Sequence, residues 1–310
     1  GLPRSGSRPP PQIPTRGGPI VKRSIPHVKK VIVVASGKGG VGKSTVAVHL
    51  ALSLALNAPS GTARVGILDL DIFGPSIPKL MGLENIEEPE LTENGSLIPL
   101  VNHGLQCMSM GFLLPRSPGG SNADTAVVWR GLMVQKAVQQ LLFDVDWRGR
   151  EGDKGHPLDA LVIDMPPGTG DVALTLGQLV KVDGAVIVST PQDVALVDAR
   201  KGVSMFRKVS VPILGVLLNM SYFSCGSCNT PHHIFGPLTP FHNTAEELSL
   251  RVLGELPLVA AVSSGGDAGM PAILGSDHQA AEVKQVMKAV ACTVWSGVGQ
   301  HVAQPGAASM

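Results

Sequence analysis

Residues 37–44 carry the pattern of a phosphate-binding loop. They are Gly-Lys-Gly-Gly-Val-Gly-Lys-Ser, which matches G-x-x-x-x-G-K-[ST] in full. Glycines let the backbone turn tightly, so that successive N–H groups can point at an anion. Lys43 would place a positive charge beside the β- and γ-phosphates of a nucleotide, and the Ser44 hydroxyl is suited to Mg²⁺. The residues expected to bind the nucleotide here are Gly37, Lys38, Gly39, Gly40, Val41, Gly42, Lys43, Ser44 and Thr45.

Three carboxylates follow apolar segments elsewhere in the chain. Asp69 and Asp71 come at the end of residues 65–70, and Asp164 ends an apolar segment that begins at residue 158. The carboxyl ends of parallel strands meet at the edge of a sheet where ligands bind. We therefore expect Asp69 and Asp164 to serve Mg²⁺ and Asp71 to orient an attacking water. Helix capping is the simpler alternative for the Asp-x-Asp pair.

Cys225 and Cys228 form a C-x-x-C motif, whose two thiolates can share a metal. Two cysteines cannot complete a tetrahedral site or a four-cysteine cluster site. Two copies of the chain meeting on a two-fold axis would supply four thiolates for an iron–sulfur cluster. The alternative is a zinc site that also uses His232 or His233. The spacing leaves both alternatives open. The remaining cysteines, expected in the core, are Cys107 and Cys292.

The segments around these residues alternate between strand and helix patterns. Residues 31–35 are apolar and β-branched, which is typical of a buried parallel strand, and residues 45–58 follow as a helix. Further strands are predicted at 65–70, 98–101, 105–110, 158–163, 184–190, 213–218 and 252–257. Further helices are predicted at 127–143, 241–250 and 276–295. Another helix is predicted to begin near residue 172, and one more follows residues 191–193 and ends near residue 206. This alternation predicts an α/β fold, a doubly wound and mostly parallel sheet of the P-loop NTPase type.

Residues 166–170, Pro-Pro-Gly-Thr-Gly, can form neither a regular strand nor a helix start. Their glycines would let this segment close on a γ-phosphate as switch loops do. Asp171 is expected either to cap the helix that follows or to take part in sensing the nucleotide.

The composition bounds the domain organisation. The chain has 310 residues, 44% hydrophobic residues, 37 glycines and a net charge of +1. This supports one large α/β domain at 29–296 and offers no overall field for nucleic acid or a membrane surface. No apolar run is long enough for a transmembrane segment. Residues 1–28 are expected to be a flexible basic, Pro-rich arm, and 297–310 a flexible tail. Because the arm has basic residues and no acid, it is typical of the segment that remains downstream of a removed mitochondrial presequence.

Lys38 is a second lysine inside the loop, which makes it K-G-G-x-G-K-[ST]. The loop resembles that of the deviant Walker A ATPases, a class that includes MinD, ParA and iron–sulfur carriers. This resemblance implies that Lys38 acts across a nucleotide-sandwich dimer and joins Lys43 and Asp71 in catalysis. It also implies that Asn219, after the predicted strand 213–218, binds the adenine, so that ATP is favoured over GTP.

The motifs D-x-D-x-x-G-P-S, D-x-P-P-G-T-G-D, N-M-S and C-x-x-C follow this loop in one order. Over residues 30–295 the chain resembles the Mrp/ApbC/NBP family of iron–sulfur scaffold ATPases. The resemblance implies a weak ATPase and a homodimer with a [4Fe–4S] cluster on Cys225 and Cys228. It further implies delivery of the cluster, received from an upstream donor, to apo iron–sulfur proteins.

Within this family the segments GLPR, CMSMGF and HIFG are most similar to a mitochondrial branch that serves the assembly of respiratory complex I. The expected location is therefore the mitochondrial matrix, with the cytoplasm second. Two other functions are alternatives for this chain. A ParA/MinD-like positioning ATPase would need a basic DNA-binding face or a membrane helix, and a zinc-stabilised nucleotide-binding module would need bound zinc.

Overall fold

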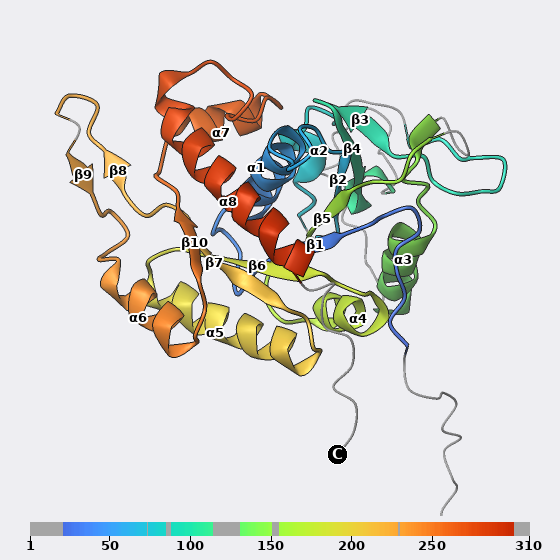
Figure 1. Ribbon diagram of the computed structural model, residues 1–310, viewed down its shortest axis with the longest axis horizontal. Coiled ribbons are helices and arrows are strands. Elements are labelled where there is room, and N and C mark those ends of the chain that lie inside the picture. The colour runs from blue at the N-terminus through green and yellow to red at the C-terminus, as the bar shows by residue number, and fades with distance from the viewer. Residues whose placement is uncertain are drawn as a thin grey trace, which may run out of the picture.

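The computed structural model describes residues 21–72, 74–84, 88–113, 131–150, 155–228 and 230–300. Within these ranges an eight-stranded sheet forms the centre of the molecule, in the order β10-β7-β6-β1-β5-β2-β4-β3 (Figure 1). Neighbouring strands pair in parallel except β3 and β4. The strands are β1 Val31–Ser36, β2 Val65–Asp69, β3 Leu100–Asn102, β4 Leu105–Ser109, β5 Ala160–Asp164, β6 Gly184–Ser189, β7 Ile213–Leu218 and β10 Val252–Glu255.

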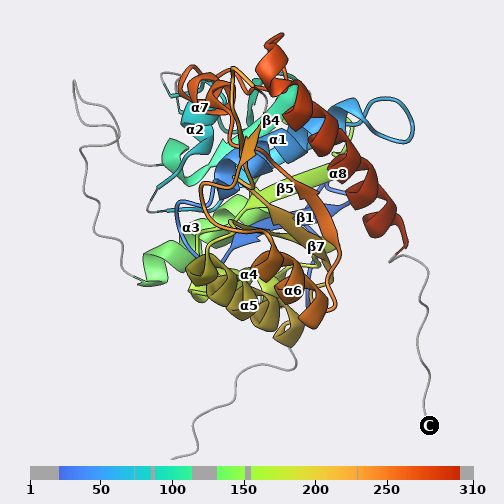
Figure 2. The same ribbon diagram turned by 90° about the vertical axis from the view of Figure 1, so that its left-hand side faces the viewer.

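Helices cover both faces of this sheet (Figures 1 and 2). One face carries α1 Lys43–Leu56, α2 Ile77–Leu80, α7 Ala260–Asp267 and α8 Ala281–Gln300. The other side carries α3 Gly131–Phe143, α4 Asp171–Leu179, α5 Asp193–Lys208 and α6 Thr239–Glu247. Short 3₁₀ helices occur at Met110–Phe112 and His278–Ala280. The predicted doubly wound α/β fold is confirmed.

The central strands are buried along their whole length, as the apolar runs predict. Every residue of β1, β5 and β6 is buried, because helices pack on both sides of a parallel sheet. Cys107 is buried on β4, as expected, whereas Cys292 is exposed because it lies on the solvent side of α8. Of the helices in the described ranges, none has the length and apolarity to cross a membrane.

Several predicted boundaries differ from the structure. Helix α1 begins at Lys43, two residues early, because Gly42 adopts a left-handed conformation as its N-cap. Asp171 is not the N-cap of α4: Gly170 is, and Asp171 lies in the first turn, where its charge suits the helix dipole. Residues 127–130 of the predicted helix 127–143 lie outside the described ranges.

The two ends of the domain also differ from the expected limits. Residues 21–28 form a strap along the sheet: Arg23 pairs with Val180 and Val28 pairs with Leu158. Ile25 between them is 2% exposed. Residue 28 is therefore too late as the end of the arm, because residues 23 and 28 pair with other segments and Ile25 is buried. Helix α8 continues to Gln300, beyond the expected start of the tail at residue 297.

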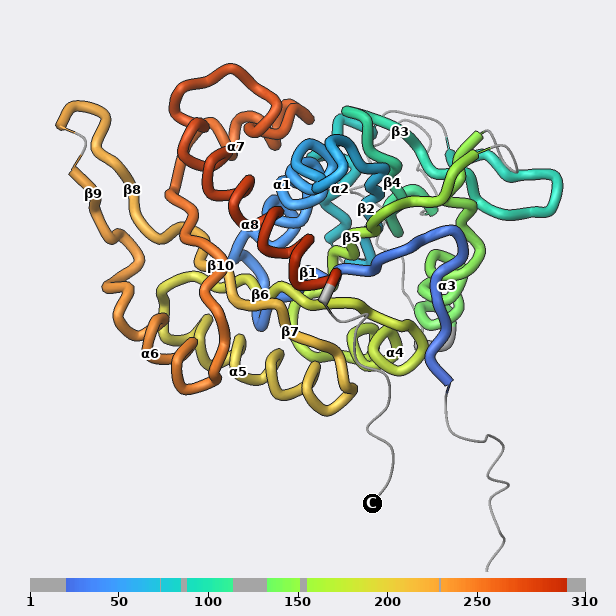
Figure 3. The backbone as a smooth tube through the Cα atoms, in the orientation of Figure 1, coloured from blue at the N-terminus to red at the C-terminus, as the bar shows by residue number. Residues whose placement is uncertain are grey.

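The chain between β7 and α6 leaves the sheet as a hairpin of its own. Strands β8 (Phe223–Ser224) and β9 (Pro231–His232) pair antiparallel and project away from the sheet (Figure 3). This hairpin carries Cys225 and Cys228.

Candidate functional site

The loop between β1 and α1 forms an anion cradle at the carboxyl end of the sheet. Gly42 has φ +80°, which a residue with a side chain rarely adopts. Gly37 lies so close to α5 that a Cβ there would be 2.1 Å from the main-chain carbon of Asp198. A cleft of about 600 Å³ opens in front of the loop, with Lys43 and Ser44 in its wall. The cradle, the helix N-terminus and this cleft fit the phosphates of a nucleotide.

Lys43 and Asp164 form a buried ion pair at the base of this cleft. The Nζ of Lys43 donates to Asp164 Oδ1 at 2.6 Å and lies 3.2 Å from Ser44 Oγ. Burial raises the pKa of Asp164, and the Lys43 ammonium opposes that shift. The second oxygen, Asp164 Oδ2, is buried and has no hydrogen-bond partner among the described residues. An unpaired buried carboxylate oxygen beside a hydroxyl fits a hard cation such as Mg²⁺.

Asp69 is aligned with Asp164 on the neighbouring strand and organises the segment that follows it. Its carboxylate accepts hydrogen bonds at 2.9–3.2 Å from the backbone N–H groups of Asp71, Ser76 and Ile77 and from Ser109 Oγ. Burial raises the pKa of Asp69 to about 7, and the charge of Asp164 adds to this shift. Sequence analysis missed this positioning role. The expected contribution to Mg²⁺ remains a prediction, supported by the place of Asp69 beside Asp164.

The walls of the cleft bring together further polar residues. Asp71 and Lys38 both line it, and Lys38 Nζ donates to Gln192 Oε1 at 3.3 Å. Lys79 also lines it and forms an ion pair of 3.0 Å with Glu84. The contact of Gln192 with Lys38 and the place of Lys79 in this wall were not predicted from the sequence. The signal for Gln192 was its place just after strand 184–190, at the same sheet edge.

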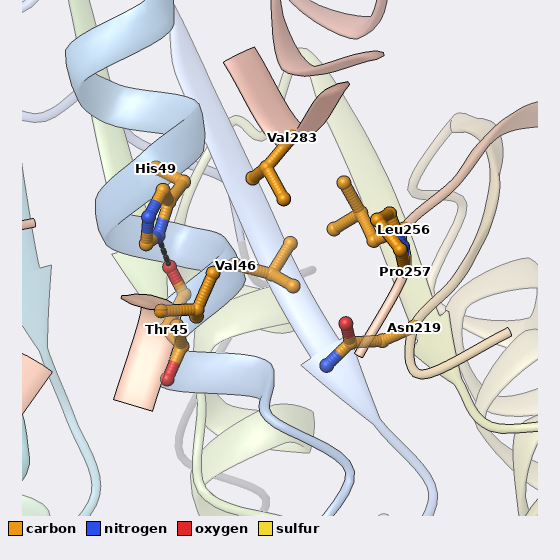
Figure 4. Close-up of a pocket in the computed structure, with 8 residues that line it drawn as sticks. Thr45, Val46, His49, Asn219, Leu256, Pro257 and Val283 are labelled. Carbon is orange, nitrogen blue, oxygen red and sulfur yellow. Dashed lines mark hydrogen bonds between the residues drawn. The ribbon is translucent and has the colours of Figure 1, made fainter. Parts of the chain in front are cut away.

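Asn219 supports the phosphate loop from the end of β7. Its Nδ2 donates to the carbonyl oxygen of Val41 at 2.8 Å. The same amide packs on Gly42, where a Cβ would lie 2.3 Å from Nδ2. Asn219 also lines a small cleft with Thr45 and His49 (Figure 4). Binding of a base by Asn219 stays a prediction, and the hydrogen bond to the loop is a role that sequence analysis did not foresee.

The C-x-x-C motif lies at the turn of the β8–β9 hairpin. Cys225 donates its backbone N–H to Thr230 O at 3.0 Å, and the exposed Cys228 Sγ lies 3.2 Å from Thr230 Oγ1. The hydrogen bond with Thr230 lowers the pKa of Cys228, which favours the thiolate.

The zinc alternative would require further ligands near this turn. His233 Nδ1 instead lies 3.1 Å from Ser221 O, at the base of the hairpin. Over the described ranges, no group of three or more His, Cys, Asp or Glu residues could hold a metal ion. One chain, as far as it is described, therefore assembles no zinc site here.

The hairpin projects away from the sheet (Figure 1), and neither cysteine is among the residues that line the nucleotide cleft. Hydrogen bonds hold the base of the hairpin to the chain after β10. Ser221 donates to Leu256 O through both its N–H and its hydroxyl, at 2.9 and 2.8 Å. Leu258 N–H donates to Tyr222 O at 2.7 Å. The base of the hairpin is thereby fixed to the turn after β10.

Comparisons with known proteins agree with these features. The ParA-type family model described as NUBPL iron-transfer P-loop NTPase matches residues 27–295. The iron–sulfur cluster transfer protein NUBPL of Mus musculus is 50% identical over 286 residues, which cover 89% of this chain and 83% of the mouse protein. The Arabidopsis thaliana iron–sulfur protein required for NADH dehydrogenase, mitochondrial, is 45% identical over 260 residues. These residues cover 84% of this chain and 76% of the Arabidopsis protein.

One solved structure shows the same architecture. It is a nucleotide-binding protein from Archaeoglobus fulgidus in complex with ADP, in which Co was found. It superimposes with a TM-score of 0.63 at 34% identity and covers 78% of this chain and 87% of its own.

Proposed function

The chain belongs to the ParA-type family of NUBPL iron-transfer P-loop NTPases, and from this premise we propose that it is an ATP-dependent carrier of a [4Fe–4S] cluster. Relatives across this family are named iron–sulfur cluster transfer or carrier proteins. The observation that carries the proposal is the joint presence of a complete phosphate loop and of the half-buried Cys225 and exposed Cys228 on a hairpin that follows Asn219, whose amide donates to that loop.

We assign the nucleotide chemistry to the residues around the cleft. Lys43 moves from Asp164 to the β- and γ-phosphates of ATP, and Asp71 orients a water toward the γ-phosphorus. The new P–O bond replaces the bond to the β–γ bridging oxygen, which yields ADP and phosphate. Mg²⁺, when held by Ser44, Asp164 and Asp69, would neutralise charge on the phosphates. Lys38 is proposed to reach the nucleotide of the partner in a dimer.

The cluster is the cargo of this carrier. Cys225 and Cys228 supply two thiolates, and a second copy of the chain supplies two more, so that a homodimer completes a four-thiolate site. The lowered pKa of Cys228 supports this role, because iron binds the thiolate.

We propose apo iron–sulfur proteins of respiratory complex I as recipients, supplied by an upstream cluster donor. The Arabidopsis relative supports this, since its name states a requirement for NADH dehydrogenase and a mitochondrial location. We accordingly propose the mitochondrial matrix as the location, with the cytoplasm as the second choice.

Nucleotide binding is proposed to change how the cluster is held. Asn219 contacts the phosphate loop, and Ser221, two residues later, is fixed to Leu256. A shift of the loop on nucleotide binding would therefore reach the base of the hairpin through a short rigid segment.

The test is anaerobic reconstitution with iron and sulfide, followed by absorption spectra, iron and zinc content and native mass. We expect about four irons per dimer. The double variant Cys225→Ser/Cys228→Ser should hold none, whereas Cys292→Ser, which removes another exposed cysteine, should load normally. Tightly bound zinc without a cluster would contradict the carrier function and leave the nucleotide site standing.

The proposed link to the nucleotide has a separate readout. Transfer of the preloaded cluster to an apo-ferredoxin should change with MgATP in the wild-type protein and not in Lys43→Met. Equal transfer rates with and without MgATP in the wild-type protein would contradict the link while leaving the carrier function intact.

A further inference from the structure

A small cleft lies behind the phosphate loop, between α1 and the carboxyl ends of two strands. Figure 4 shows the α1 side chains on one side and residues from β7, the turn after β10 and α8 on the other. The residues that matter here are Thr45, His49, Asn219, Leu256 and Pro257. Thr45 and Asn219 also belong to the phosphate-loop region, so the cleft continues from the site of the phosphates.

His49 presents an unused hydrogen-bond acceptor in this region. It is 4% exposed, and its Nδ1 lies 2.7 Å from Thr45 O (Figure 4). A carbonyl oxygen only accepts, so Nδ1 must carry the hydrogen. Burial lowers the pKa of His49, which keeps the ring neutral at neutral pH. Nε2 is therefore a bare acceptor, and it is buried without a partner among the described residues.

A buried acceptor without a donor is rare in folded proteins and points to a missing partner. Phosphates held in the loop before α1 would leave the rest of the nucleotide near Thr45 and Asn219, which lie beside that loop. The Nδ2 of Asn219 is committed to Val41 O, so its remaining side-chain atom, Oδ1, is also an acceptor. The polar groups of the cleft thus call for a ligand that brings donors.

We propose that His49 is a specificity-determining residue of the nucleotide site, whose Nε2 accepts a hydrogen bond from the exocyclic amino group of adenine. The inference rests on the proposed ATP binding and extends it. Adenine carries an amino donor at the 6-position, whereas guanine carries an oxygen there, which would face the lone pair of Nε2. His49 therefore favours ATP over GTP.

The cleft has to open for this contact. Its volume of about 20 Å³ suits one water and is too small for a purine ring. The inference therefore requires the apolar turn at Leu256 and Pro257 to move away from helix α1. Binding of the base therefore displaces the turn whose Leu256 O accepts from Ser221.

The test compares ADP with purine riboside 5′-diphosphate, which has hydrogen in place of the amino group. In the wild-type protein ADP should bind about three- to tenfold more tightly, the range of one hydrogen bond. His49→Leu, of similar volume, should bind both ligands equally, because it has no acceptor. His49→Gln, whose amide oxygen accepts, should keep part of the preference. His242→Leu, a histidine on α6 paired with Glu255, is the control.

An unchanged preference for ADP in a folded His49→Leu variant would overturn the inference. The inference would also be overturned if His49→Leu lost the preference for ADP over 2′-deoxy-ADP instead. Nε2 of His49 would then accept a hydrogen bond from the ribose and not from the base. If the wild-type protein binds none of these diphosphates, the proposed nucleotide site itself fails, which is a distinct result. ¹⁵N-histidine spectra of the wild-type protein give a second readout, because the Nε2 resonance of His49 should shift with ADP and not with the riboside.

Discussion

Lys43 of the phosphate loop and Asp164 at the end of β5 form an ion pair in which both side chains are buried, with exposures of 6% and 0%. The lysine that is expected to hold the phosphates is thus held by the carboxylate that is expected to serve Mg²⁺. Nucleotide and Mg²⁺ together would replace this contact, since Lys43 would then bind the phosphates and Asp164 would bind the cation. The pair makes binding of the two ligands interdependent.

Asp164→Asn should therefore abolish the effect of Mg²⁺ on ADP binding. Without Mg²⁺, ADP should bind the variant more tightly than the wild-type protein, by roughly tenfold, because a competing buried charge is gone. Added Mg²⁺ should tighten binding to the wild-type protein and not to the variant. Calorimetric titration with and without Mg²⁺ measures both. Asp159→Asn, which removes a carboxylate at the other end of β5, should behave as the wild-type protein.

Gly42→Ala should disable the phosphate loop for two reasons. Its φ of +80° is strained for alanine, and the new Cβ would lie 2.3 Å from Asn219 Nδ2. Gly40 has a φ of +79°, and no atom lies within 4 Å of a Cβ placed there. Gly40→Ala therefore shows the effect of backbone strain without a side-chain clash. We expect Gly40→Ala to lower the free energy of unfolding by about 1–3 kcal/mol and Gly42→Ala to lower it more. Urea unfolding and ADP titration check this, and equal losses would show that the Asn219 contact is unimportant.

Thr230→Val should make Cys228 less reactive in the cluster-free protein. The Thr230 hydroxyl lowers the pKa of Cys228, so its loss raises the pKa and reduces the thiolate fraction near neutral pH. Alkylation of Cys228 by iodoacetamide, followed by peptide mass spectrometry, should slow several-fold at about pH 7 and be unchanged at about pH 10. Thr230→Ser keeps a hydroxyl and should react as the wild-type protein. A slower rate at both pH values would indicate reduced access to the thiol instead.

His49 predicts a specific dependence of stability on pH. Burial lowers its pKa in the folded state below the unfolded value of 6.5. Below that value the unfolded chain binds a proton that the folded chain does not, so stability falls as the pH falls. Between about pH 7.5 and 5.5 the free energy of unfolding of the wild-type protein should fall by up to about 1.4 kcal/mol more than that of His49→Gln. Urea unfolding at both pH values tests this. Equal losses of stability in the wild-type protein and in His49→Gln would mean that the pKa of His49 is the same in the folded and the unfolded chain.

Ile25→Ala should show that the strap before β1 belongs to the domain. Ile25 is 2% exposed, and removal of such a buried side chain lowers the free energy of unfolding by about 2–5 kcal/mol. Val21→Ala, at a residue that is 77% exposed, should have little effect. Thermal and urea unfolding compare the two variants. Equal stability of both would restore the expected arm up to residue 28.

The sequence determined the features that short contiguous segments encode. The apolar, β-branched runs gave strands at the expected places, and residues 37–44 formed the predicted loop, because these patterns depend on local sequence. The order of the motifs was enough to indicate the family, which the comparisons confirmed.

Only the tertiary structure decided which residues meet. Asn219 reaches Val41 across 178 positions of sequence, and Lys43 pairs with Asp164 across 121. These contacts follow from strand order, with β1 placed between β5 and β6, and from the register of each pair. Sequence patterns specify strands and not the order in which they pair, so the loop-holding roles of Asn219 and Asp69 and the unpaired acceptor of His49 emerged only from the folded chain.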